Sequence, residues 1–166
     1  MNPNLFQEAL ISAMYRLLFL SAPKSDGKPK QTAYVKALHL AMTAFSATVL
    51  LQAQGTEARF EELSLQLREA IYSLNVDTQA PNEAHVWILV IAGISAITSE
   101  DDHWLLPLLR QMLPSVEVST WAEMRVLLKK FLWIDTIHDK GGRNLFNQVT
   151  RHGSILSPEK RDKTLS

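Results

Sequence analysis

The chain has 166 residues, enough for one compact domain, and an ordinary globular composition with 46% apolar and 20% charged residues. Its 17 basic and 17 acidic residues cancel at neutral pH, so it lacks the basic excess typical of a domain that binds nucleic acid by itself. It has no cysteine, which excludes disulfide bonds, thiolate metal sites and cysteine nucleophiles. We therefore expect no direct DNA binding by this chain alone.

The apolar runs of the chain are more typical of buried helices than of membrane spans. The N-terminal run has no positive cluster at its start and is interrupted by Glu8 and Arg16, which disfavours a secretory signal. The runs Ala37–Leu51 and Val86–Thr98 fall short of the roughly 20 residues that cross a bilayer. We expect no membrane association, and the absence of cysteine fits an intracellular location.

Three helices are predicted in the first half of the chain. Apolar residues at helical spacing run from Asn4 to Leu20, and a lysine-rich loop with two prolines and a glycine follows. A second pattern spans Gln31–Gln54, where alanines between larger apolar residues let another helix come close. Gly55 is a natural stop for this helix. The third helix carries an apolar stripe of Phe60, Leu63, Leu67, Ile71 and Leu74.

The segment Asn82–Thr98 is apolar almost all round, which predicts a central helix covered by its neighbours. Pro81 and Glu83 suit its first turn. Gly93 lies inside it and predicts a close contact with a neighbouring element. Glycine there lowers helix stability by about 1 kcal/mol relative to alanine, so we expect packing to require it.

Two further helices are predicted in the second half of the chain. Ser99 and the acids after it favour a helix start ahead of Trp104, and Pro107 is expected to kink that helix or delay its regular part. Thr120 and Glu123 have the spacing of a capping box. The strongest amphipathic stripe of the chain follows, formed by Met124, Leu127, Leu128, Phe131 and Leu132. This helix is expected to end at the glycine pair Gly141–Gly142.

These patterns predict an all-α protein, a single bundle of about six or seven helices over residues 1–150. Residues 151–166 are polar and are expected to form a flexible tail. Seven residues are predicted to lie near the packing centre or to form a ligand or partner surface: Trp87, Gly93, Trp104, Trp121, Leu128, Phe131 and Trp133.

One polar cluster is a weak candidate site. Asp135, His138 and Asp139 are spaced to share a helix face, so Asp135 could orient His138, or the three could hold a cation. No second metal-binding motif accompanies them. We favour a partly exposed ion pair near a helix C-terminus, where a histidine suits the negative end of the helix dipole.

The remaining candidates favour structure over chemistry. The acidic run Glu100–Asp102 with His103 could suggest a metal site, but adjacent positions of a helix point in different directions, so we favour a helix start that carries negative charge. His39 and His85 lie among apolar residues, which is typical of core or boundary histidines. No serine stands in a nucleophile elbow. We predict no catalytic residue, no bound metal and no cofactor, hence a protein that is not an enzyme.

The order of features from Trp87 to Phe146 resembles the C-terminal part of the regulatory domain in fungal zinc binuclear-cluster transcription factors. The features are WILVIAGISA, then SEDDHWLLPLL, STWAEMRVLLKKFLWIDTIHD and GGRNLF. FQEALISAMYRLLFL and YVKALHLAMTAFSATVLL agree more loosely with earlier helices of that region, so the resemblance covers about residues 5–149.

The resemblance implies an all-α, nuclear regulatory module that acts through protein–protein contacts. It also implies a possible small-molecule effector. In the family, DNA contact belongs to six cysteines that hold two zinc ions, and this chain has none. It also lacks the upstream part of the regulatory domain, so a protein partner or missing domain segments are expected. Two alternatives stay open: a small-molecule-binding helical module, and a metal-dependent enzyme that uses Asp135, His138 and Asp139.

Overall fold

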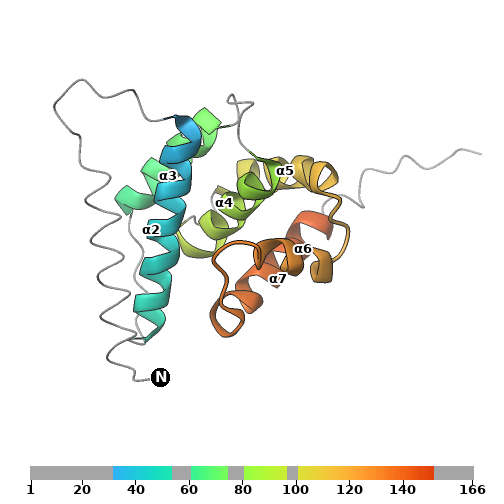
Figure 1. Ribbon diagram of the computed structural model, residues 1–166. Helices are drawn as coiled ribbons and strands as arrows, with labels where there is room; N and C mark the ends of the chain where they lie inside the picture. The colour runs from blue at the N-terminus through green and yellow to red at the C-terminus, as the bar shows by residue number, and fades with distance from the viewer. Residues whose placement is uncertain (1–31, 54–60, 75–80, 97–100, 152–166) are drawn as a thin grey trace, which may run out of the picture.

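A computed structural model describes residues 32–53, 61–74, 81–96 and 101–151. This part of the chain forms six α-helices and one 3-10 helix and contains no strand, which confirms the all-α prediction (Figure 1). The elements are α2 (Ala33–Ala53), α3 (Glu61–Leu74), α4 (Asn82–Ser95), α5 (Asp102–Met112), η2 (Leu113–Val116), α6 (Trp121–Leu128) and α7 (Asp135–Arg151). The expected helix Asn4–Leu20, the stop at Gly55, the cap at Ser99 and the tail after Arg151 lie outside the described residues.

α4 is the central helix, as its continuous apolar run predicts. It contacts every other element of the described chain, and every residue from Ala84 to Ala92 is buried. Figure 1 shows α2 and α3 on one side of α4, and α5, α6 and α7 on the other. Because neighbours surround α4, no face of it is left for the polar residues that a surface helix carries.

α2 packs along α3 and also against α4. The alanines Ala37, Ala41 and Ala44 are almost fully buried, and their small size lets the neighbouring helices approach closely. By length and composition alone, Ala33–Leu50 would also be able to cross a membrane, although a core helix meets the same criteria and half of this window is buried inside the protein. The absence of a membrane span stays a prediction.

α5 is helical from Asp102 onward, so Pro107 does not delay its regular part. The N-cap residue Asp101 makes no capping hydrogen bond with its own helix. Its carboxylate accepts hydrogen bonds from Arg68 of α3 and from the indole of Trp104, both at 2.9 Å. This acid therefore ties α3 to the start of α5.

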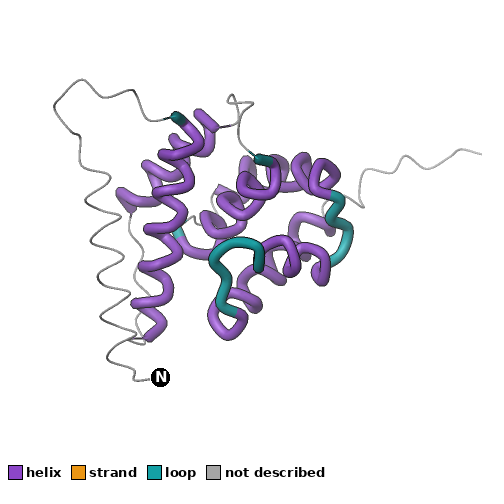
Figure 2. Tube along the Cα trace, viewed as in Figure 1, coloured by secondary structure: helices purple, strands orange, loops and turns teal. Residues whose placement is uncertain are grey.

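The expected single helix up to the glycine pair is wrong. Its start is confirmed, because Thr120 and Glu123 form both hydrogen bonds of the capping box. α6 ends at Leu128, however, and Figure 2 shows a loop before the next helix. Gly141 and Gly142 then lie inside α7. The chain reverses direction between α6 and α7 and lays the two helices against each other.

Candidate functional site

The aromatic residues singled out in the sequence fall into three separate groups. Trp87 is 1% exposed, whereas the side chains of Trp104, Trp121, Phe131 and Trp133 are half-buried at the margin of the core. The three ring pairs, with their centroid distances, are Trp87–Phe131 at 5.8 Å, Trp121–Trp133 at 6.4 Å and Tyr72–Trp104 at 5.3 Å. Leu128 is fully buried in the core. The indoles therefore act as packing elements at several contacts between different parts of the fold.

Trp87 joins α4 to the loop between α6 and α7. Its indole N–H donates a hydrogen bond of 3.0 Å to the carbonyl oxygen of Leu132, and its ring stacks on Phe131. A buried indole generally needs such a partner for its N–H. These two contacts hold residues 129–134 in a non-helical path.

Gly93 in α4 and Gly142 in α7 have no side chain, so side chains from elsewhere in the fold can pack directly on these two helices. A Cβ added at Gly93 would lie 2.9 Å from methyl groups of both Leu105 and Leu145, which agrees with the close contact expected there. A Cβ at Gly142 would lie 2.8 Å from Trp133 and 2.9 Å from Trp121. Gly142 therefore allows both indoles to rest on the backbone of α7.

The acids of the polar cluster lie in the first turns of α7, and the expected position at a helix C-terminus is wrong. Both acids are ion-paired, but with basic residues outside the cluster and not with His138. Asp135 accepts hydrogen bonds from Arg125 at 2.6 Å and from Lys129 at 2.7 Å, and Asp139 accepts one from Arg125 at 2.9 Å. The hydrogen bond from Lys129 is the main cause that lowers the pKa of Asp135. Asp135, in the first turn of α7, also complements the positive end of the helix dipole.

His138 points away from these acids and into the core. It is 1% exposed, and its ring lies between Phe45 at 4.8 Å and Trp133 at 5.1 Å. Its Nδ1 atom lies within hydrogen-bonding distance of the backbone N–H and the carbonyl of Ile134, and the tautomer decides which of the two it bonds. Asp135 therefore does not orient His138, and within the described ranges no three potential ligands are grouped to hold a metal.

We predict that the protein loses stability in mild acid through His138. Burial lowers the pKa of His138 from its usual 6.5, against smaller raising effects of Ile134 and Asp139, and burial also lowers the pKa of His85. Below about pH 6.5 the unfolded chain then binds more protons than the folded protein. For each proton that the unfolded chain binds and the folded protein does not, the free energy of unfolding falls by up to about 1.4 kcal/mol per unit of decreasing pH.

Urea unfolding between pH 8 and pH 5 measures this effect. His138→Phe keeps an aromatic ring beside Phe45 and should flatten the profile below pH 6.5, while His85 retains its own part of the slope. A His138→Phe profile as steep as that of the unchanged protein would contradict the prediction.

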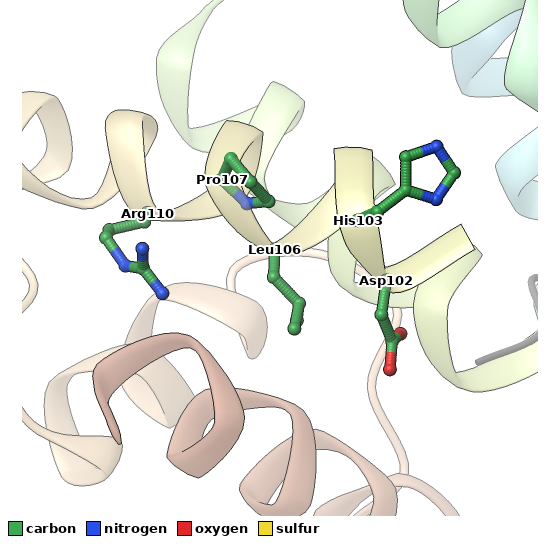
Figure 3. Close-up of a pocket in the computed structure, with 5 residues that line it drawn as sticks. All are labelled: Asp102, His103, Leu106, Pro107 and Arg110. Atoms are coloured by element: carbon green, nitrogen blue, oxygen red, sulfur yellow. The ribbon is translucent and has the colours of Figure 1, made fainter. Parts of the chain in front are cut away.

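A hollow of about 270 Å³ lies along α5 and is lined by Asp102, His103, Leu106, Pro107 and Arg110. Figure 3 shows the side chains of Asp102, Leu106 and Arg110 on one side of the helix, with His103 turned away from Asp102. Arg110 donates a hydrogen bond from Nε to the carbonyl oxygen of Val149 and so joins α5 to α7. The acid and the imidazole therefore do not converge on a shared ligand.

A second hollow, of about 540 Å³, lies between α6 and α7. Indole, aliphatic and cationic side chains line it together with one acid: Trp121, Ala122, Arg125, Val126, Lys129, Asp139 and Arg143. Val126 and Arg143 were not predicted as site residues from the sequence. The one sequence signal was an apolar Val126 on the polar side of an amphipathic stripe, between Arg125 and Lys129.

Besides Nε2 of His85 and Nε2 of His138, two polar groups are buried without hydrogen-bond partners in the described part of the chain. The indole N–H of Trp121 is one, and the hydroxyl of Ser95 in α4 is the other. Ser46, by contrast, donates its hydroxyl hydrogen to the carbonyl oxygen of Met42 inside α2. None of these groups forms a nucleophile–base pair with a histidine in the residues described.

No family model, curated protein or solved structure matches this chain. The likeness to the regulatory domain of zinc binuclear-cluster factors therefore rests on the order of aromatic and apolar features alone.

Proposed function

We propose that the chain is a helical regulatory module that acts through contacts with other proteins in the nucleus, as a relative or a piece of a zinc binuclear-cluster regulator. The single observation that carries the proposal is the surface of α6 and the loop after it. Val126 is 65% exposed and lines the α6–α7 hollow together with the half-buried indole of Trp121 and three cationic side chains, and Leu132 in the loop is 44% exposed. Apolar side chains clustered at a surface favour a protein contact.

The polar cluster supports the same proposal. Asp135 and Asp139 are engaged by Arg125 and Lys129, and His138 is enclosed by aromatic rings. An acid–base or metal-dependent reaction would first have to release these groups from the contacts that hold the start of α7. The described residues thus favour an interaction module over an enzyme.

A reporter assay tests the proposal. The whole chain is fused to a heterologous DNA-binding domain, and transcription of a reporter with the matching operator is measured against the DNA-binding domain alone. We expect a change in reporter transcription, and expect Trp87→Ala to weaken it by destabilising the module. Reporter transcription that stays equal to that of the DNA-binding domain alone, with a folded and nuclear fusion protein, would refute the proposal.

A small-molecule effector is the second candidate, and the α6–α7 hollow favours it, because a volume of about 540 Å³ lies within the range of ligand pockets. Trp121 lines this hollow and would report a ligand through its fluorescence. A metabolite screen followed by tryptophan emission tests this function. A saturable change that is lost in Trp121→Phe supports it, and the absence of a saturable change in every ligand class refutes it.

A further inference from the structure

The surface formed by Trp121, Arg125, Val126, Lys129 and Arg143, here called the α6–α7 face, combines charge with exposed apolar area. α6 supplies Trp121, Arg125 and Val126, and α7 supplies Arg143, while Lys129 follows the end of α6. The two helices pack on each other, so the face has a fixed scaffold (Figure 1).

The charge of this face is positive. Three cations and one acid, Asp139, line the hollow. Arg125 and Lys129 are paired with Asp135 and Asp139, but Arg143 has no carboxylate partner among the described residues. The guanidinium of Arg143 instead lies 6.0 Å from the ring centroid of Trp121. An exposed cation held over an indole is well placed to accept a carboxylate from outside.

The apolar part of the face lies beside this cation. Val126 is more exposed than any other large apolar side chain in the described ranges. Tryptophan and arginine are the residue types most enriched where protein contacts concentrate their binding energy. Trp121 and Arg143 meet on this face, next to Val126, so the charge and the apolar area of the face both favour a partner segment that carries acidic and apolar side chains.

We propose that the α6–α7 face binds an acidic peptide segment of a partner protein, with an apolar side chain on Val126 and Trp121 and a carboxylate on Arg143. The inference rests on the proposed function and names its contact surface. The hollow accommodates only a few side chains, and interfaces of that size are typical of weak, transient complexes, so we expect micromolar to millimolar affinity. Salt should weaken the complex, because exposed charges are screened.

The probe is a fluorescein-labelled synthetic peptide in which glutamates alternate with leucines and phenylalanines. Fluorescence anisotropy with the full chain measures its affinity, and a matched peptide carries lysine at every glutamate position. We expect binding of the acidic peptide only. Arg143→Glu and Val126→Asp should each weaken it about tenfold or more, the equivalent of at least 1.4 kcal/mol. Leu65→Asp, on an exposed position of α3, is the matched control and should leave binding unchanged.

Val126 and Arg143 are both exposed, so their variants should stay folded, which circular dichroism melting checks. Equal binding of both peptides, or binding that survives Arg143→Glu and Val126→Asp, would overturn the proposal, as would no binding up to millimolar peptide. Binding of free phenylacetate with the same dependence on Arg143, without peptide binding, would assign the face to a small carboxylate and overturn the peptide assignment.

The reporter assay separates the two proposals. If the fusion protein changes transcription but the acidic peptide does not bind, the α6–α7 face is refuted and the regulatory function stands. If the peptide binds at this face but the reporter does not respond, the regulatory function is refuted and the binding face stands.

Discussion

Replacing Trp87 with alanine should lower the free energy of unfolding by about 3–5 kcal/mol, the range typical of a large aromatic residue removed from a core. Trp87 is 1% exposed and lies in α4, the helix that all the other described elements contact. Its removal leaves a cavity at the centre of the fold. It also removes the indole hydrogen bond to Leu132 and the stacking on Phe131 that hold the loop after α6.

Urea unfolding followed by circular dichroism measures this loss. Trp87→Phe keeps most of the buried ring and removes the indole N–H, so it should lose far less stability than Trp87→Ala. Trp133→Ala is the matched comparison on a half-buried indole, and its loss should be the smaller one, because less apolar area returns to water. A Trp87→Ala loss below about 1 kcal/mol, the centre of the distribution for single substitutions, would contradict the central position of α4.

The central position of α4 was predictable because the signal is local and strong. A continuous apolar run after Pro81 leaves no polar face, whatever its neighbours are. The capping box was predictable for the same reason, since Thr120 and Glu123 are three residues apart. In both cases the residues that decide the structure lie within a few turns of one another.

The reversal after Leu128 was not predictable from the periodicity. The apolar stripe continues through Phe131 and Leu132, so a helix to the glycine pair satisfies the local pattern. The chain leaves the helix after Leu128, and the carbonyl of Leu132 accepts a hydrogen bond from the indole of Trp87, 45 residues away. A contact over such a separation leaves no trace in the local spacing.

The candidate site depends on that reversal. The spacing of Asp135 and Asp139 indicated a shared face, but their ion-pair partner Arg125 could be placed opposite them only once α6 and α7 fold back on each other. The hollow that contains Val126 and Arg143 arises in the same way. His138 was predicted beside the acids because three- and four-residue spacings allow it, whereas packing against Phe45 of α2 turns it inward.

Gly142→Ala should destabilise the protein by about 1–3 kcal/mol, the usual range for a methyl group forced into a packed site. Helix propensity alone predicts the opposite sign, since alanine in a helix interior is favoured over glycine by about 1 kcal/mol. The contacts decide between the two effects. The new Cβ would lie 2.8 Å from Trp133 and 2.9 Å from Trp121, and both contacts are with atoms of rigid indole rings.

The indoles have little room to yield. Trp133 is held by a hydrogen bond to Asp139 and lies beside His138, and Trp121 packs on Phe146. Gly141→Ala is the matched control in the same turn of α7, where the nearest atom would be a methyl carbon of Ile94 at 3.3 Å. It should stay within about 1 kcal/mol of the unchanged protein, because the gain in propensity offsets a small adjustment. Thermal unfolding of both variants decides the question: if Gly142→Ala melts as high as Gly141→Ala, the indoles do not rest on α7 as tightly as the structure places them, and the reversal that builds the α6–α7 face is held mainly by Trp87.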